Sequence, residues 1–157
     1  MERVSGFHPV REALRRGAAG VRRVLVERGL DGHSDADVLL HALTDAVLGA
    51  AGLGDLGALF PPGDPEWKDA SSVRLLEIVM TRAAAAGFRV VNCDLTLIAE
   101  APKLAPHRER IRARLARVLG VEPGAVGLKA TTHEGLGALG RGEGMAALAV
   151  VLLARED

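Results

Sequence analysis

The chain has 157 residues, 20 of them basic and 20 acidic, and this zero net charge argues against a nucleic-acid binder that relies on bulk basicity. With 48% hydrophobic and 25% charged residues, it is typical of one folded globular domain and not of a disordered chain. Its single cysteine excludes an internal disulfide framework and fits a reducing compartment.

The first half of the chain alternates between helical and extended patterns. Residues 8–16 predict a short helix and residues 21–27 a strand. Residues 34–51 predict a strong helix with Ser34 as its N-cap. Residues 52–65, rich in glycine and proline, predict a loop that is longer than most connections, which favours a functional role. The core face of the strong helix is predicted to hold Val38, Leu39, Ala42, Leu43 and Val47.

The second half continues the alternation. Helices are predicted over 69–87 and 107–119, strands over 88–99, 126–131 and 145–154, and loops over 101–106 and 133–144. In the strand over 88–99, one predicted face holds Val90, Asn92, Asp94 and Thr96, and the other holds Val91, Cys93, Leu95 and Leu97. We therefore predict an α/β (α+β) fold, with residues 1–157 forming one domain.

Two features bear on localisation. The longest apolar run, residues 145–154, is about half of the length that spans a bilayer. The N-terminal residues lack the apolar stretch of a secretory signal. We expect a cytoplasmic protein with no membrane partner.

The zero net charge conceals an uneven distribution. Residues 1–30 carry seven basic and three acidic side chains, residues 31–80 carry two and nine, and residues 81–157 carry eleven and eight. The acidic middle segment indicates either a solvated face or a cation site.

One candidate site lies in that acidic segment. Asp37, His41 and Asp45 recur every four residues, so they lie along one face of the predicted helix. A histidine between two carboxylates is well placed as a metal ligand, and the carboxylates would orient its ring. A solvated polar face is the competing interpretation, because zinc needs three protein ligands for catalysis.

A second candidate site follows the strand over 126–131. The segment KATTHE, residues 129–134, brings hydroxyls, a histidine and a carboxylate to a strand end, which suits phosphate and divalent-metal contacts. The loop that follows has five glycines among residues 135–144, and Arg141 adds a bidentate donor. A long turn without a ligand is the competing interpretation.

Five motifs, taken together, carry a resemblance to a known family. They are HSDADVLLHALTD (33–45), GDLG (54–57), APK (101–103), KATTHE (129–134) and GRGEG (140–144). In this order and spacing, over residues 29–157, the chain resembles the 2-C-methyl-D-erythritol 2,4-cyclodiphosphate synthases of non-mevalonate isoprenoid biosynthesis.

The resemblance implies a mixed four-stranded sheet with helices on one face, in a homotrimer with active sites at the subunit interfaces. It implies a phosphorus–oxygen lyase that cyclises 4-diphosphocytidyl-2-C-methyl-D-erythritol 2-phosphate and releases CMP. Zn²⁺ would align the phosphates, and Mg²⁺ or Mn²⁺ would bridge the α- and β-phosphates. Nucleic acid is not an expected partner.

The resemblance also assigns residues to roles. His41 and His8 are the candidate zinc ligands, Glu134 is the ligand of the second metal, and Thr132 and Asp45 are the candidate catalytic residues. The candidate substrate-binding residues are His33, Ser34, Asp55, Gly57, Phe60, Asp64, Ala99, Pro102, Lys103, Leu104, Ala105, Thr131, Thr132, His133, Glu134 and Arg141.

The first 28 residues depart from the family. Its Gly-x-Asp-x-His zinc motif is replaced by GFHPV, so that His8 stands at the Asp position and Val10 at the His position. This segment resembles instead the start of RNA ribose 2′-O-methyltransferases. Two hypotheses follow: a working synthase with an altered zinc site, or a trimeric cytidine-nucleotide-binding relative with little or no turnover. RNA binding through the N-terminus ranks third, because seven basic residues do not by themselves recognise a specific RNA sequence.

Overall fold

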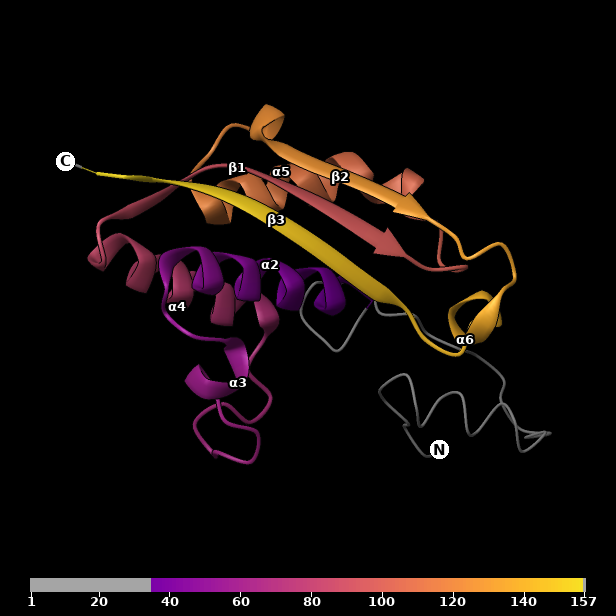
Figure 1. Cartoon of the computed structure of the whole chain (residues 1–157), viewed down its shortest axis with the longest axis horizontal. Coiled ribbons are helices and arrows are strands. Elements are labelled where there is room, and N and C mark those ends of the chain that lie inside the picture. The colour runs from indigo at the N-terminus through magenta and orange to yellow at the C-terminus, as the bar shows by residue number, and fades with distance from the viewer. Residues whose placement is uncertain (1–34, 157) are drawn as a thin grey trace.

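The structure, a computed structural model, describes residues 35–156 as five helices, two short 3₁₀ turns and three strands (Figure 1). The elements are, in chain order, α2 (Asp35–Ala51), α3 (Leu56–Leu59), α4 (Ser72–Ala85), β1 (Phe88–Ile98), η1 (Ala105–His107), α5 (Arg108–Leu119), η2 (Pro123–Ala125), β2 (Val126–Thr131), α6 (Gly137–Gly140) and β3 (Ala146–Arg155). The helix and strand predicted over 8–16 and 21–27 lie outside the described residues.

The three described strands form one mixed sheet in the order β2-β1-β3. β1 pairs in parallel with β2, from Cys93 opposite Val126 to Ile98 opposite Thr131. β1 pairs in antiparallel with β3 over its whole length. The predicted mixed sheet is therefore confirmed for three strands, and the fourth predicted strand falls in the part of the chain that is not described.

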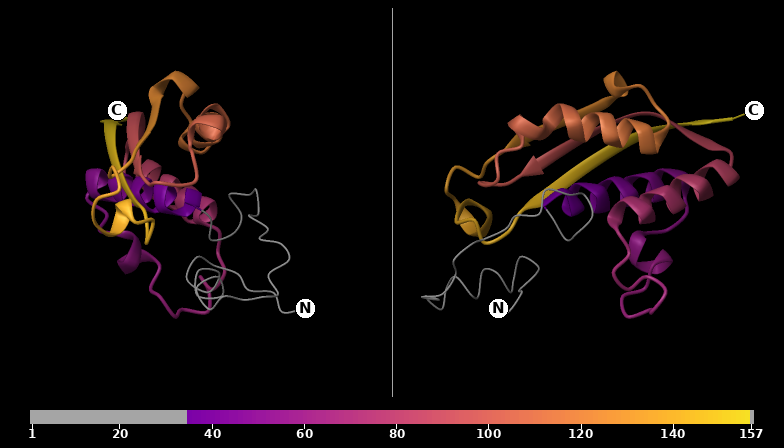
Figure 2. Two further views of the ribbon diagram at one scale, coloured as in Figure 1. Left: turned by 90° about the vertical axis from the view of Figure 1, so that its right-hand side faces the viewer. Right: turned by 180° about the vertical axis from the view of Figure 1, so that it is seen from behind.

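The helices α2, α4 and α5 cover one face of the sheet (Figure 2). The side chains of β1 that face them, among them Leu95 and Leu97, are buried with the apolar faces of the three helices in one continuous core. The other face of the sheet leaves three large side chains of β3 uncovered: Leu148 is 62% exposed, Val150 72% and Leu152 53%. The sheet is thus packed on one face only.

Local chemistry sets the start of α4 and the end of α5. At the start of α4, the Ser71 side-chain oxygen accepts a hydrogen bond from the Arg74 amide at 3.3 Å. At the end of α5, Gly120 adopts a left-handed conformation with φ of 69°, which glycine reaches at no steric cost. The helix predicted over 107–119 begins one residue late and ends as predicted, whereas the helix predicted over 69–87 begins three residues late and ends two residues early.

The strand β1 differs from its predicted alternation at one position. Val90 was placed on the polar face but is 4% exposed, on the same side as Cys93. The pairing with β3 shifts register between Val90 and Asn92, so Val91 is an extra residue in the strand. Such a bulge switches the facing of every residue before it. The prediction for Val90 was wrong because period-two reasoning assumes an unbroken ladder.

Two predicted loops contain short helices, and the buried face of α2 is wider than predicted. The segment 52–65 holds α3, and the segment 133–144 holds α6. In α2, the predicted core positions Leu39, Leu43 and Val47 are buried, whereas Val38 and Ala42 are half-buried. Leu40, Thr44 and Leu48 are buried in addition. The helix packs against both β3 and α4, so contacts on two sides bury more than one stripe.

Cys93 is the only thiol in the chain, and it lies buried in β1. Burial, reinforced by the negative charge of Asp94, raises the pKa of this thiol from 9.0 to about 11. The folded protein therefore holds the Cys93 proton at a pH where the unfolded chain has already released it.

This difference predicts a loss of stability in alkali. The contribution of Cys93 is fully present below pH 9 and falls as the pH rises from 9 toward about 11. Urea unfolding at pH 8 and pH 10 should show the free energy of unfolding falling further in the wild type than in Cys93→Ala. Equal losses in the two proteins would contradict the assignment.

Candidate active site

His41 is held from one side by a serine of the neighbouring helix. His41 is exposed on α2, and its Nε2 lies 3.1 Å from the Oγ of Ser72 in the first turn of α4. Ser72 is 6% exposed, so its hydroxyl is a fixed partner for the ring. With Nε2 engaged, Nδ1 is the ring nitrogen left for a metal ion.

Asp45, one turn further along α2, contacts the loop that the sequence singled out. Its Oδ1 accepts a hydrogen bond from the Leu56 amide at 2.8 Å. Asp55 caps the same short helix α3, because its Oδ1 accepts from the Ala58 amide at 2.8 Å. The two carboxylates thereby hold the GDLG turn against α2. In this contact, Asp45 positions the turn.

Phe60 and Asp64 hold the rest of that loop in shape. Phe60 is 5% exposed, and its ring meets Trp67 edge-on, with centroids 4.9 Å apart and planes at 79°. The Oδ1 of Asp64 accepts from the Glu66 amide at 2.9 Å. The described contacts of both residues are therefore structural ones within the loop.

The second group of candidate residues lies where β1 and β2 end, at one edge of the sheet (Figure 1). The Ala99 amide donates to the Thr131 carbonyl at 3.0 Å and extends the parallel pairing beyond the strands. The side chain of Leu104 is buried, whereas Pro102 and Lys103 before it are exposed. The loop is thus anchored at both ends and presents its middle to solvent.

Glu100 ties this loop to the one after β2. Its Oε1 accepts from the amide of His133 at 3.0 Å and from the amide of Gly135 at 3.4 Å. Between those two amides, Glu134 adopts a left-handed conformation with φ of 53°. A residue with a side chain pays about 1–2 kcal/mol in this region, so the surrounding contacts must hold it there.

Thr132 and Glu134 contact each other within the same turn. The Glu134 amide donates to the Thr132 Oγ1 at 3.3 Å, and that hydroxyl lies 3.5 Å from the Glu134 Oε1. Both side chains are exposed. A hydroxyl and a carboxylate are thus presented together at the sheet edge, next to the loop over 99–104.

The glycine-rich loop after Glu134 is compact for a steric reason. A side chain on Gly140 would overlap the backbone of Gly135, so the two segments can approach only because Gly140 lacks one. The Arg141 Nε donates to Glu143 at 2.8 Å, and this hydrogen bond raises the pKa of the guanidinium above its ordinary value. Arg141 is exposed and permanently charged.

The structure therefore brings the candidate residues together in two groups. His41, Asp45, Asp55 and Gly57 belong to the helical side, near α3, and the other group lies at the sheet edge near α6; two views keep α3 and α6 apart (Figures 1 and 2). The predicted residues outside the described part are His8, His33 and Ser34.

Residues 35–156 contain neither a cluster of metal ligands nor a helix that could span a membrane. Within them, no three or more histidine, cysteine or acidic side chains are arranged to hold a metal ion, and His41 is the one predicted zinc ligand that is described. The helices of the same range are too short or too polar to cross a bilayer.

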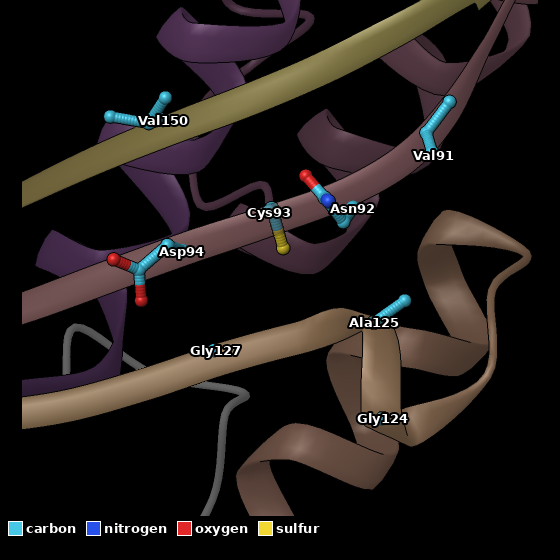
Figure 3. Close-up of a pocket in the computed structure, with 8 residues that line it drawn as sticks. All are labelled: Val91, Asn92, Cys93, Asp94, Gly124, Ala125, Gly127 and Val150. Carbon is cyan, nitrogen blue, oxygen red and sulfur yellow. The ribbon is translucent and has the colours of Figure 1, made fainter.

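A shallow pocket of about 550 Å³ lies apart from both groups, between β1, η2 and the start of β2 (Figure 3). Asn92, Asp94, Gly127 and Val150 are among the residues that line it. Asp94 pairs with Lys129 across the two strands. The pocket contains no predicted site residue, so it is a feature of the uncovered sheet face.

Sequence reasoning missed Ser72 and Glu100. The sequence indicates Ser72 only as part of a helix start, and nothing in the spacing links it to His41, 31 residues earlier. Glu100 directly follows the candidate substrate-binding residue Ala99, and this position is the one feature of the sequence that points to it. Its partners are 33 and 35 residues away, so only tertiary structure identifies them.

Comparison with known proteins gives consistent results. The sequence profile of the YgbB family matches residues 6–154. The chain is 58% identical to a 2-C-methyl-D-erythritol 2,4-cyclodiphosphate synthase of Symbiobacterium thermophilum over 82% of each chain. It is 63% identical to a bifunctional enzyme IspD/IspF of Anaeromyxobacter, over 81% of this chain and 33% of that one. The structure of IspF from Plasmodium falciparum in complex with CDP superimposes with a TM-score of 0.69 and 29% identity, over 80% of this chain and 76% of that one.

The extent of these matches bears on the N-terminal segment. The family profile begins at residue 6, inside the segment of residues 1–28 that departs from the zinc motif. The chain spans about a third of the bifunctional relative and about four fifths of the single-function one. On the profile match over most of its length and on these identities, the chain belongs to the YgbB family, whose members include relatives named 2-C-methyl-D-erythritol 2,4-cyclodiphosphate synthase.

Proposed function

We propose that the chain cyclises 4-diphosphocytidyl-2-C-methyl-D-erythritol 2-phosphate to 2-C-methyl-D-erythritol 2,4-cyclodiphosphate and releases CMP. The observation that carries this proposal is the 58% identity to a synthase of that name over four fifths of both chains. The geometry supports it, since the loop over 99–104 and the Thr132–Glu134 turn adjoin at one sheet edge. The names of the relatives favour the synthase over a binding protein without turnover.

The reaction asks the protein for positioning and charge neutralisation. An oxygen of the 2-phosphate attacks the β-phosphorus, and the new P–O bond closes the ring. The bond from the β-phosphorus to the oxygen shared with the α-phosphate breaks, and its electron pair leaves with CMP. No external nucleophile is consumed.

The residues at the sheet edge fit the nucleotide end of this substrate. The loop from Ala99 to Ala105 receives the cytidine at its exposed middle, with Lys103 beside the phosphates. The Thr132 hydroxyl donates to a phosphate oxygen, and Thr131, His133 and Arg141 complete this side. The fixed turn around Asp55 and Gly57 receives the sugar hydroxyls, with His33, Ser34, Phe60 and Asp64 around it.

Two cations belong to the proposal. His41, oriented through Ser72, would hold Zn²⁺ together with His8, and Glu134 would hold Mg²⁺ or Mn²⁺. Cations held there would supply positive charge to neutralise the phosphates. Among the described residues, His41 is the single zinc ligand, whereas a catalytic zinc site needs three protein ligands.

The uncovered sheet face supports a homotrimer. Three neighbouring large apolar side chains that are more than half exposed form a patch of the kind that marks a protein interface. We propose that the sheets of three copies pack together through Leu148, Val150 and Leu152. Two separated groups of site residues then meet across subunit boundaries, so each active site draws on two chains.

The activity is tested by measuring CMP release from the diphosphocytidyl substrate with Zn²⁺ and Mg²⁺ present. We expect turnover that depends on the divalent ion, because the phosphates must be neutralised. Binding of CDP without CMP release at saturating metal would instead establish the binding-only alternative.

His41 gives a second test. His41→Ala should abolish both zinc content, measured by elemental analysis, and CMP release, because it removes the ligand that Ser72 orients. His107→Ala, which removes another exposed histidine, should leave the zinc content unchanged. Zinc that survives in His41→Ala would show that this assignment is wrong.

The oligomer gives a third test. Val150→Asp places a charge in the middle of the apolar patch, where burial without a partner is costly. Analytical ultracentrifugation should show a trimer for the wild type and a folded monomer for this variant. Ala84→Asp, which adds the same charge to an exposed position on α4, should remain a trimer. A Val150→Asp trimer would rule out this face as the interface.

A further inference from the structure

Glu100 occupies a place that the proposed reaction does not use. It stands between Ala99 and Pro102, but its side chain is half-buried and turns toward the neighbouring loop. There, one carboxylate oxygen accepts hydrogen bonds from the amides of His133 and Gly135. The Glu100 side chain thus joins the loop over 99–104 to the loop that carries Glu134, the proposed ligand of the second metal.

The two amides flank Glu134 on either side. Backbone N–H groups that converge on one anion form a concave nest, which arises where successive residues adopt an αR-αL or a turn conformation. Glu134 with φ of 53° and Gly135 with φ of 76° provide that backbone. The carboxylate of Glu100 therefore stabilises a conformation that Glu134 would otherwise rarely adopt.

The direction of the Glu134 side chain depends on that conformation. In a left-handed residue, the Cα–Cβ bond points to the opposite side of the chain from where a helical residue would place it. The Thr132 hydroxyl, 3.5 Å from the Glu134 Oε1, supports the same placement from within the turn. Glu100 supports it from the outside, across 34 residues of sequence.

From these contacts we infer that Glu100 is a positioning residue, which fixes the turn at Glu134 so that Glu134 can bind a divalent cation. Glu100 also holds this turn against the loop over 99–104, the proposed cytidine site. This inference rests on the proposed function for its metal and its nucleotide. The role of Glu100 is to accept two hydrogen bonds through one oxygen, and its charge is not required for that. An amide oxygen at the same place can accept both bonds.

The chemistry of acceptance gives a matched pair of variants. Glu100→Ala removes the acceptor and leaves two amides without a partner, whereas Glu100→Gln keeps an acceptor of the same reach. Glu122→Ala, at an exposed site before η2, serves as a control for the loss of a carboxylate.

Hydrogen exchange of the peptide covering 131–137 is measured first, in metal-free and substrate-free full-length protein. We expect faster exchange in Glu100→Ala, and wild-type exchange in Glu100→Gln and Glu122→Ala. Equal exchange in wild type and Glu100→Ala would overturn the inference. Glu100→Gln exchanging like Glu100→Ala would also overturn it, because the charge would then be responsible.

The Mg²⁺ dependence of CMP release is measured next. Loss of a residue that orients a metal ligand weakens metal binding by about tenfold or more, so Glu100→Ala should need about ten times more Mg²⁺ for half-maximal rate. At saturating Mg²⁺ and substrate its kcat should return to within about threefold of wild type, as for a defect in binding. Glu100→Gln should restore the wild-type requirement. An unchanged Mg²⁺ requirement with a lowered kcat would overturn the positioning role.

The two results separate this inference from the proposed function. If wild-type protein released no CMP, the proposed function would fail, while the exchange contrast would still decide whether Glu100 fixes the turn. If wild type were active and Glu100→Ala matched it in both measurements, the inference alone would fail.

Discussion

The parallel pairing of β1 with β2 is the constraint on which the candidate site depends. Parallel strands end at the same edge of a sheet, so the segments that follow them must begin side by side. The pairing continues past the strands through the Ala99 amide and the Thr131 carbonyl, and Glu100 then joins the two loops. The loop over 99–104 and the turn at Glu134 are thereby held in one rigid frame.

The one-sided packing of the sheet has a second consequence. Three helices bury one face. On the other face, the exposed leucines and valine of β3 lie opposite polar residues of the paired strand β1. The described residues thus form a packed core on one face of the sheet and leave large apolar side chains exposed on the other. The helical group, near α3, and the edge group, near α6, lie apart within one chain (Figures 1 and 2). In the proposed homotrimer, one interface would cover the exposed side chains of β3 and bring the two groups together.

Several elements could be predicted from local sequence because local forces decide them. The helical period of α2 and the end of α5 at the left-handed Gly120 require no distant partner. The bulge at Val91 could not be predicted, because it arises from the pairing of β1 with β3. Nor could the burial of Leu40 and Leu48, which depends on α2 being covered by both β3 and α4. The short helices α3 and α6 fall below the length at which periodicity is detectable.

For the site, the sequence by itself determined the kinds of group and their order: the histidine between two carboxylates, the glycine–aspartate turn, and the threonines and glutamate after β2. These are chemical identities, and motif spacing preserves them. Only the tertiary structure decided what each group touches. It gave His41 its Ser72 partner, turned Asp45 toward the Leu56 amide, and placed Glu100 between two loops. The reason is physical: hydrogen-bond partners separated by 11 to 35 residues are chosen by the packing of helices on a sheet, which no local pattern encodes.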